Sequence, residues 1–576
     1  MHPLLEIQDL SVQFTGAEGR APAVSKVSLT VERNEIVALV GESGSGKSVT
    51  ALSILRLLPG PPAVATEGSI RFSGDGLARI DLCCCTQPIL RNIRGNRIAM
   101  IFQEPMTALN PVLTCGSQVV ETLRRHRKLD RPSARTKTLE WFRNVRLPDP
   151  ETIFNKYPHQ LSGGQKQRVM IAMALCCEPD LLICDEPTTA LDVTVQKTIL
   201  QLIKELQERS GMGVLFITHD LGVVYEIADR ALVMYRGTIV EQQRCEPLFR
   251  QPKHPYTRAL LACRPAQHRQ GERLPVVADF LNRTQESAIA PNDTPSSQKT
   301  SPTSSEILVG VRDLTVCFRG SRTLFARRIP DMVAVDNVSF DVFRGETLGL
   351  VGESGCGKTT LGRTLIRLIE PTTGSIRYRD EDITRIPPDR FRMMRREMQI
   401  VFQDPFSSLN PRMTIGSAIT EPMQVHGLNG SDRQRKDKVV ELLERVDLRA
   451  EHFKRFPHEF SGGQRQRIVI ARALAMNPSF LICDESVSAL DVSVQAQVLN
   501  LLNDLKRDLG FTLIFISHDL SVVHYISDRI LVMNRGRIEE SGSANAIYHS
   551  PRSAYTQQLI ASIPGKDLPL PALSTE

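Results

Sequence analysis

One long stretch of this chain occurs twice. The stretch "LSGGQKQRVMIAMALCCEPDLLICDEPTTALD" begins at Leu161, and "FSGGQRQRIVIARALAMNPSFLICDESVSALD" begins at Phe460, with nineteen of the thirty-two aligned positions identical. A second pair, "GESGSGKS" and "GESGCGKT", precedes these stretches by a similar distance in each half. The period is far too long for a stacked repeat protein. The chain is therefore predicted to consist of two related domains.

The segment between the halves differs in composition from both of them. "TQESAIAPNDTPSSQKTSPTSSE" is rich in Ser, Thr and Pro and poor in large apolar residues, so it cannot bury enough surface to offset the entropy lost on ordering. We expect a first domain at 1–265, a flexible linker at 266–305 and a second domain at 306–576. Within each half, short β-branched runs such as "EIVALV" alternate with helical patterns such as "VQKTILQLIKELQ". This alternation predicts α/β domains with parallel strands.

Length and composition exclude several classes of protein. A chain of 576 residues is too long for a single core, and a net charge of +7 is a mild excess for that length. The twelve cysteines form no CxxC pair, which is typical of free thiols in a reducing compartment. The beginning has no signal-peptide pattern, and no run of about 18 apolar residues occurs. These features predict a cytosolic chain without membrane-spanning helices.

The glycine-rich stretches match the P-loop pattern in both halves. Each follows an apolar strand and precedes a helical pattern, which is the context that this motif requires. Backbone N–H groups of such a loop cradle a phosphate, while Lys47 and Lys358 reach the β- and γ-phosphates and the hydroxyls of Ser48 and Thr359 ligate Mg²⁺. The cofactors expected are thus ATP and Mg²⁺, bound twice. The predicted loop residues are Gly41, Glu42, Ser43, Gly44, Ser45, Gly46, Lys47 and Ser48, and Gly352, Glu353, Ser354, Gly355, Cys356, Gly357, Lys358 and Thr359.

Two carboxylates end an apolar strand in each half, in "LLICDE" and "FLICDE". Ligands bind at the carboxyl ends of strands in open α/β sheets. Asp185 and Asp484 suit the Mg²⁺ shell, and Glu186 and Glu485 are placed to act as general bases on the attacking water.

A histidine and a glutamine also follow apolar strands in both halves. His219 and His518 can hydrogen-bond the γ-phosphate and orient the water. Gln103 and Gln403 are weaker candidates, whose amides could contact the metal or the lytic water. All four are predicted as catalytic residues, and the two glutamines also as metal ligands.

In their order along the chain, these motifs resemble the nucleotide-binding domain of ABC ATPases. The resemblance rests on the P-loop, the glutamine, SGGQ, DE, ALD and the strand-end histidine, and it covers both halves. It implies an α/β fold with two tandem P-loop NTPase domains of the ABC type. Each domain would have a RecA-like core, an antiparallel β subdomain and a helical signature subdomain.

The resemblance also assigns a role to SGGQ, which stands just before a helix. In the family, two domains dock head to tail, and the signature of one closes over the P-loop of the other. Carried over, Ser461 and Gly463 would cap ATP on the first P-loop, and Ser162 and Gly164 would cap ATP on the second. Both halves keep the motif residues, so two hydrolytic sites are expected. Phe14 and Phe318 match the adenine-stacking position, and the alternative is that they are buried strand residues.

Three kinds of ABC protein remain as alternatives: a transporter ATPase, a twin-domain translation factor acting on ribosomes, and a DNA-repair or chromosome ATPase. Translation factors join their domains by a charged helical arm, unlike the Pro/Ser/Thr-rich segment here. DNA-repair members insert zinc modules, but this chain has no CxxC pair. Nucleic-acid binding also predicts stronger basic clustering than +7.

Several further stretches resemble the ATPases of the peptide, nickel and glutathione importer family: "IFQEPMTALNP", "VFQDPFSSLNP", "YPHQLSGGQ", "FPHEFSGGQ" and "HPYTRALL". The resemblance implies a peripheral ATPase that energises import of peptides or peptide-like solutes at the cytoplasmic face of the bacterial inner (plasma) membrane. Its partners would be two integral-membrane permease subunits and a periplasmic or extracellular solute-binding protein, and no nucleic acid. Dipeptide, glutathione and nickel chelate all remain open as cargo.

The chain departs from this family in places. Ser553-Ala554 stands where the family has His-Pro before Tyr-Thr, so we assign no conserved contact to the second tail. The cysteine-rich tail of some members is absent, and Cys263 stands alone, so no iron–sulfur cluster is expected. The run from Cys83 to Cys85 is read as an inert inserted loop. Cys356 lies in the second P-loop near a helix N-terminus, which is expected to lower its pKa and to make it a site of inhibitory modification.

Overall fold

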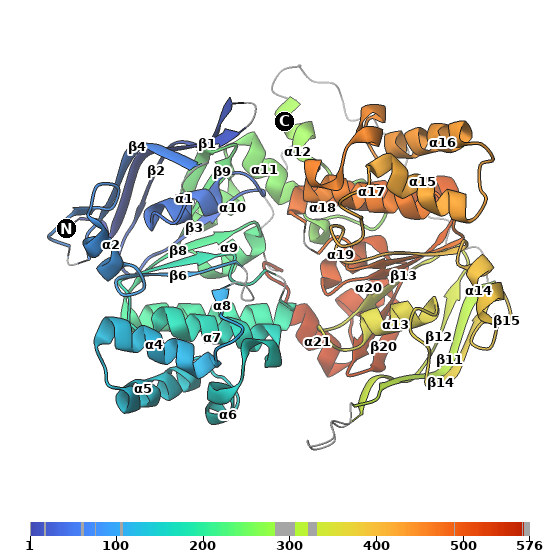
Figure 1. Ribbon diagram of the computed structural model, residues 1–576, viewed down its shortest axis with the longest axis horizontal. Coiled ribbons are helices and arrows are strands. Elements are labelled where there is room, and N and C mark those ends of the chain that lie inside the picture. Colours follow the sequence, from blue (N-terminus) through green and yellow to red (C-terminus); the bar gives the residue numbers. More distant parts are fainter. Residues whose placement is uncertain are drawn as a thin grey trace. The chain divides into compact units, whose positions relative to one another are not determined.

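The computed structural model describes residues 2–16, 19–58, 63–74, 76–103, 108–189, 191–282, 306–320, 331–488, 490–566 and 568 (Figure 1). The chain forms two compact units. Unit 1 comprises Met1–Leu191, Val195–Leu261 and Pro564–Glu576, and unit 2 comprises Asp192–Thr194 and Ala262–Ile563. We describe each unit by itself.

The central sheet of unit 1 has the strand order β10-β9-β3-β8-β7-β6. All neighbours pair in parallel except β10, which is antiparallel to β9. β3 and β7 are buried at every position, as expected for strands covered on both faces. The bounds are β3 (Ile36–Val40), β6 (Ile98–Ile101), β7 (Leu181–Asp185), β8 (Gly213–Thr218), β9 (Arg230–Tyr235) and β10 (Thr238–Arg244).

The same unit holds an antiparallel sheet and a group of helices. The antiparallel sheet has the order β2-β1-β4-β5, with β1 (Leu5–Gly16), β2 (Gly19–Val31), β4 (Ala63–Phe72) and β5 (Ile80–Asp81). The helical part contains α4 (Cys115–Arg127), α5 (Arg131–Asn144), α6 (Pro150–Asn155) and α7 (Gly163–Leu175). Further helices are α1 (Lys47–Ile54), α2 (Gln87–Ile93), α8 (Val193–Ser210), α9 (Leu221–Ile227), α10 (Cys245–Arg250) and α11 (Pro255–Ala262).

Unit 2 repeats this architecture. Its central sheet has the order β16-β17-β18-β13-β19-β20, and its antiparallel sheet the order β12-β11-β14-β15. The strands are β11 (Ile307–Phe318), β12 (Met332–Phe343), β13 (Thr347–Val351), β14 (Thr373–Tyr378), β15 (Glu381–Asp382), β16 (Met398–Val401), β17 (Phe480–Asp484), β18 (Thr512–Ile516), β19 (Arg529–Asn534) and β20 (Arg537–Ser543). The helices include α13 (Lys358–Leu365), α14 (Pro388–Met394), α15 (Ile415–Val425), α16 (Asp432–Arg445), α17 (Gly462–Leu474), α18 (Val492–Leu509), α19 (Leu520–Ile526), α20 (Ala544–His549) and α21 (Ala554–Ala561).

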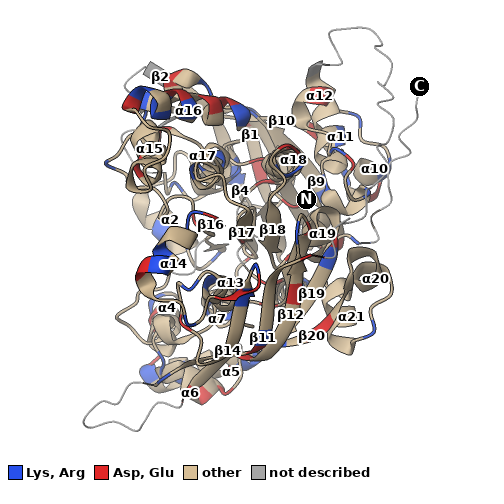
Figure 2. Cartoon of the chain, turned by 90° about the vertical axis from the view of Figure 1, so that its right-hand side faces the viewer, with Lys and Arg blue, Asp and Glu red and all other residues tan. Residues whose placement is uncertain are grey.

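The predicted fold class is confirmed in both units. Each has a mostly parallel core, an antiparallel sheet and a helical part that carries SGGQ. The central strands β17 and β18 are almost free of charge, whereas α16 carries residues of both signs (Figure 2). Ser431 begins α16 with a capping box, and ion pairs such as Lys438 with Glu441 lie along its surface. Apolar strands and amphipathic helices thus separate the core from solvent.

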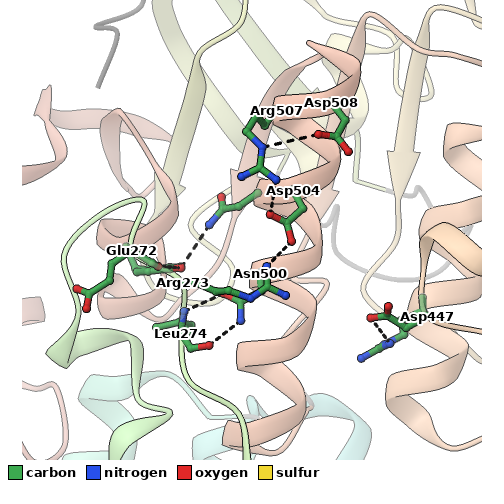
Figure 3. A network of polar contacts seen from close by, with 11 residues as sticks. Glu272, Arg273, Leu274, Asp447, Asn500, Asp504, Arg507 and Asp508 are labelled. Carbon is green, nitrogen blue, oxygen red and sulfur yellow. Dashed lines mark hydrogen bonds and ion pairs between the residues drawn. The ribbon is translucent and has the colours of Figure 1, made fainter. Parts of the chain in front are cut away.

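Residues that we assigned to the start of the linker form regular structure. They include η2 (Pro265–Gln267) and α12 (Val277–Asn282) and belong to unit 2. Figure 3 shows that the stretch around Leu274, between these two helices, contacts α18: the buried side-chain amide of Asn500 bonds both the N–H and the C=O of Leu274, at 2.9 and 2.8 Å. Residues 283–305 of the expected linker lie outside the described residues, so the domain boundaries themselves stay a prediction.

Within the part of the chain that the structure describes, none of the helices has both the length and the apolar character needed to cross a membrane.

Candidate active site

Each P-loop connects the central strand of a unit to the helix that follows it. In unit 1 it joins β3 to α1, and in unit 2 it joins β13 to α13. Gly46 and Gly357 precede the helices with φ angles of 104° and 108°, a left-handed conformation. A Cβ atom on Gly46 would stand 2.6 Å from the carbonyl oxygen of Ala23, so no side chain fits there. The motif glycines are therefore required by backbone geometry.

The P-loop lysines are buried and fold back over their own loops. Lys47 Nζ donates to the carbonyl oxygens of Gly41 at 2.7 Å and Glu42 at 2.8 Å. Lys358 makes the same two bonds in unit 2, at 2.8 and 2.9 Å. The ammonium groups thus lie within the curl of the loop, where they are predicted to meet phosphate.

A hydroxyl group of the P-loop faces a strand-end aspartate in both units. Ser48 Oγ donates to Asp185 Oδ1 at 3.0 Å, and Thr359 Oγ1 donates to Asp484 Oδ1 at 2.9 Å. Burial raises the pKa of both carboxyl groups, although these hydroxyl bonds oppose the shift. Among the described residues, the buried Oδ2 of Asp484 has no hydrogen-bond partner. A buried carboxylate beside a hydroxyl, with one oxygen unsatisfied, fits the Mg²⁺ ion that the motif implies.

Glu186 follows Asp185 and is held by three side chains. Its carboxylate contacts His219 Nδ1 at 3.2 Å and accepts hydrogen bonds from Gln103 Nε2 at 3.0 Å and Thr189 Oγ1 at 2.9 Å. Burial alone would raise the pKa of Glu186, but the bonds and charge of His219 outweigh it and lower the pKa to about 2. The group is therefore ionised at neutral pH, as a general base must be.

Glu485 has the corresponding place in unit 2 with a different set of partners. Its carboxylate accepts from Gln403 Nε2 at 2.7 Å and contacts His518 Nδ1 at 3.7 Å and Lys358 Nζ at 3.9 Å. Burial opposes the shift, but His518 lowers the pKa of Glu485, and Glu485 in turn raises that of His518. Ser488 stands where unit 1 has Thr189, and its hydroxyl donates to the backbone carbonyl of Glu485 instead.

Both strand-end glutamates have a left-handed backbone, with φ of 48° at Glu186 and 47° at Glu485. This conformation is uncommon for residues other than glycine, and it costs of order 1–3 kcal/mol where it persists. The N–H groups of the two glutamates donate to the carbonyl oxygens of Ile217 and Ile516 on the neighbouring strand. The adjacent strand thus holds each residue in a turn that aims its carboxylate at the histidine.

In each half the structure brings the predicted catalytic glutamate, histidine and glutamine into contact. Gln103 and Gln403 donate to the glutamates in the structure, and a contact with the metal stays a prediction.

The SGGQ signature begins a helix in each unit. Ser162 is the N-cap of α7 and Ser461 of α17, and both form capping boxes with the glutamine three residues later. A Cβ atom on Gly164 would stand 2.7 Å from Val195, and one on Gly463 would stand 2.3 Å from Val494. The glycines therefore allow the helix start to pack closely on the next helix. Capping of ATP by the signature of the other half stays a prediction.

The two predicted adenine-stacking residues differ in environment. Phe318 ends β11 and is 42% exposed, so its ring is available to a base. Phe14 is partly buried and packs against the core cluster of the antiparallel sheet in unit 1, which favours the alternative of a strand residue. Base stacking stays a prediction for both.

The expectation that the pKa of the Cys356 thiol is lowered is wrong. Its side chain is only 6% exposed, and burial raises its pKa, although the nearby Lys358 opposes the shift. Desolvation of a thiolate outweighs the favourable helix N-terminus at this position. Inhibitory modification of this thiol stays a prediction.

The second tail makes a contact that the sequence did not let us assign. Tyr256 and Tyr555 each place a hydroxyl 3.2 Å from a P-loop N–H group, that of Glu42 in unit 1 and of Glu353 in unit 2. The tail of unit 2 keeps this contact because Ser553 Oγ accepts the N–H of Tyr555, as His254 Nδ1 accepts that of Tyr256. A hydroxyl thus replaces an imidazole as the cap of the helix.

Sequence reasoning missed three side chains of the site: the hydroxyls of Thr189, Tyr256 and Tyr555. The tyrosines lie in the stretches "HPYTRALL" and "RSAYTQQL", which were noted without a role. Thr189 stands three positions after Glu186, a spacing that carries no signal by itself because a hydroxyl there can equally bond the backbone, as Ser488 does.

Comparison with known proteins gives consistent matches. The family model "ABC transporter" matches residues 24–189 and 335–488, and the model "Oligopeptide/dipeptide transporter, C-terminal region" matches 240–286 and 540–574. The glutathione import ATP-binding protein GsiA of Pectobacterium atrosepticum is 47% identical over 98% of this chain and 90% of its own length. GsiA of Escherichia coli K12 is 48% identical over 97% of this chain and 89% of its own length. A solved dimer of the ATP-binding cassette MJ0796 with ADP and Pi is 27% identical, with a TM-score of 0.37, and covers 41% of this chain and 98% of its own.

Proposed function

We propose, on the premise that this chain belongs to the ABC transporter family, that it is the ATP-hydrolysing subunit that energises import of peptides or peptide-like solutes. The observation that carries the proposal is the duplicated site. Each half carries a P-loop lysine bonded to its own loop, a strand-end aspartate bonded to the P-loop hydroxyl, and a glutamate in contact with a histidine and a glutamine. Both groups are complete, so both halves hydrolyse ATP.

The residues of unit 1 have distinct roles in hydrolysis. The N–H groups of the P-loop and Lys47 bind the phosphates, while Ser48 and Asp185 would hold Mg²⁺, which neutralises phosphate charge when bound. Glu186 accepts a proton from the attacking water, because its carboxylate is ionised and aimed at the site. His219 holds that carboxylate and is placed to contact the γ-phosphate. The same roles fall to the corresponding residues of unit 2.

Hydrolysis is coupled to movement through the signature helices. Each P-loop, with its ATP, is closed by the signature of the other half, so that binding of two nucleotides draws the halves together. The helix N-terminus at Ser162 supports this role, since its N–H groups and dipole favour an anion. Closure of the two halves drives a conformational change in the membrane subunits, and ATP hydrolysis allows the halves to separate again.

The import role rests on the C-terminal regions and on the relatives. Both halves carry a match to the C-terminal region of oligopeptide and dipeptide transporters, and the similar proteins are import ATP-binding proteins. A small peptide such as glutathione is therefore the favoured class of cargo. The chain acts at the cytoplasmic face of the membrane with two permease subunits, and a solute-binding protein delivers the cargo.

A groove in unit 1 supports contact with a permease. It has a volume of about 1350 Å³ and is lined by α4 and neighbouring residues, including Arg124, Arg125, Arg131 and Arg135. In members of the family, the segment that follows the glutamine contacts the coupling helices of the permeases. The groove is lined by residues that come just after this segment, which follows Gln103 here. Its basic lining favours a permease segment with acidic residues.

Affinity purification tests this function. The tagged Glu186→Gln, Glu485→Gln double variant, which keeps ATP bound, is isolated from its native cells in mild detergent with ATP. We expect two polytopic membrane proteins to co-purify, and fewer in a Lys47→Ala, Lys358→Ala control that cannot bind ATP. Recovery of ribosomes without membrane subunits would contradict import and favour a translation role.

A further inference from the structure

The C-terminal region of each half reaches back to the P-loop of its own unit. Tyr256 is the second residue of α11 and is fully buried, and its hydroxyl oxygen accepts the N–H of Glu42 at 3.2 Å. Tyr555 is the second residue of α21, and its hydroxyl oxygen accepts the N–H of Glu353 at the same distance. The contact therefore occurs twice, in two sequences that have diverged around it.

A glutamate places each tyrosine, and it is buried in unit 1 and half-buried in unit 2. In unit 1, Glu241 of β10 accepts the N–H groups of Lys253 at 2.8 Å and His254 at 3.0 Å, just before α11. In unit 2, Glu540 of β20 accepts those of Arg552 at 2.8 Å and Ser553 at 3.1 Å, just before α21. These bonds satisfy N–H groups at the helix start and hold the tail on the last strand of the central sheet.

The contact acts on a residue that anchors the P-loop lysine. The N–H of Glu42 is bonded to Tyr256, and the carbonyl oxygen of Glu42 accepts from Lys47 Nζ at 2.8 Å. In unit 2 the N–H and carbonyl of Glu353 are bonded in the same way to Tyr555 and Lys358. One residue of the loop is thus held from both sides, by the tail and by the lysine.

The hydroxyl contact is common to the two tyrosines, whereas the packing of their rings differs. In unit 1 the ring of Tyr256 packs on Tyr235, with 4.3 Å between ring centroids. In unit 2 the residue at that strand end is Asn534, which offers no ring. Burial raises the pKa of Tyr555, although the bond from Glu353 opposes the shift, so its hydroxyl stays neutral at physiological pH.

We propose that Tyr256 and Tyr555 are positioning residues for the two P-loops, and that bracing these loops for ATP is a role of the C-terminal regions. The proposal rests on the ATP binding proposed above. A loop held in its phosphate-binding shape loses less entropy when ATP binds, so the brace raises affinity without taking part in hydrolysis. Loss of one hydrogen bond is expected to weaken binding by about two- to tenfold.

The test isolates one nucleotide site at a time. In the full chain, Lys358→Ala disables the second P-loop and Glu186→Gln stops hydrolysis at the first, and calorimetric titration with ATP then gives the Kd of the first site. Adding Tyr256→Phe removes the hydroxyl alone and is expected to raise that Kd by about two- to tenfold. The matched control is Tyr235→Phe, which removes a hydroxyl from the ring stacked on Tyr256 and should leave the Kd unchanged.

The mirror experiment uses Tyr555→Phe in a Lys47→Ala, Glu485→Gln chain. Its control is Tyr525→Phe, since the hydroxyl of Tyr525 donates to Glu272 and not to the P-loop. In chains with active glutamates, Tyr256→Phe should raise the KM for ATP and leave kcat unchanged. An unchanged Kd in both tyrosine variants would overturn the brace, whereas a parent chain that binds no ATP would overturn the proposed function itself.

Discussion

At the scale of single residues, the two halves place the same chemical groups with different neighbours. Glu186 receives a hydroxyl bond from Thr189, whereas Ser488 turns its hydroxyl to the backbone carbonyl of Glu485. The glutamates themselves could be predicted, because they end apolar strands that follow a P-loop. Their hydroxyl partners could not, because a Ser or Thr side chain has several acceptors within reach and its choice depends on tertiary packing.

The carboxylate of Glu241 gives a prediction on pH. Burial opposes the shift, but bonds from backbone N–H groups of the tail lower the pKa of Glu241 below its ordinary value of 4.5. A lowered pKa stabilises the fold above pH 4.5, and this contribution is lost as pH falls through the folded-state pKa. We therefore expect Glu241→Gln to lower the free energy of unfolding by about 1–3 kcal/mol at pH 7 and by less near pH 4.

Urea unfolding of the full chain at the two pH values measures this difference. The control is Glu246→Gln, whose side chain is 70% exposed and pairs with Arg250 on its own helix, so it should change stability little at either pH. An equal loss of stability at pH 7 and pH 4 would show that the carboxylate acts through packing and not through charge.

At the scale of elements, the segment before residue 283 is more ordered than its sequence indicates. Its Ser/Thr/Pro-rich continuation suggested a linker from residue 266, but in unit 2 the stretch around Leu274 docks on α18 (Figure 3). Arg273 pairs with Asp504, and Tyr525 donates to the carbonyl of Glu272. The sequence of such an extended stretch has no periodic apolar pattern that would predict its order. The hydrogen bonds that hold it come from side chains more than 200 positions away.

We expect Asn500→Ala to release this stretch from α18. The substitution removes both bonds to the buried Leu274 and leaves its N–H and C=O unpaired, at a cost of about 1–3 kcal/mol. Amide hydrogen exchange in residues 270–277 should then accelerate by about tenfold or more, as read by mass spectrometry.

Asp508→Ala is the control for that measurement, because Asp508 lies on the same helix, is 61% exposed and pairs with Arg507. It should leave exchange in residues 270–277 unchanged. Unchanged exchange in Asn500→Ala as well would mean that other contacts hold the stretch on α18.

At the scale of the whole molecule, duplication is the central fact. Both units keep a complete group of ATP-site residues, and both keep a signature helix whose first residues are small and capped. In the proposed arrangement each signature serves the P-loop of the other half. A substitution in the signature of one half should therefore affect ATP hydrolysis at the P-loop of the other half.

Ser461→Arg places a bulky cation at the N-terminus of α17, where it blocks approach of a nucleotide carried by the first half. In a Glu485→Gln chain, in which the second site does not hydrolyse ATP, we expect turnover at the first P-loop to fall by about a hundredfold, within the range typical of lost transition-state contacts. The Kd for ATP at the second P-loop, titrated in a Lys47→Ala, Glu485→Gln chain, should not change.

Ser431→Arg is the matched control, since Ser431 is also a helix N-cap with a capping box, at the start of α16. It should reduce turnover little. If Ser461→Arg hydrolyses ATP at the rate of this control, the composite site is contradicted, although the family and the P-loops stand.

The sequence by itself determined the two-domain plan, the P-loops, the strand-end carboxylates and histidines, and the family. These features are local: apolar runs form buried strands, glycines allow a tight loop, and a parallel sheet brings the strand ends to one edge. Tertiary structure alone decided which groups hold Glu186 and Glu485, that burial raises the pKa of Cys356, and that the stretch around Leu274 lies on α18. It also decided that Tyr256 meets Glu42 across 214 positions, because such contacts depend on packing between distant elements that no local pattern records.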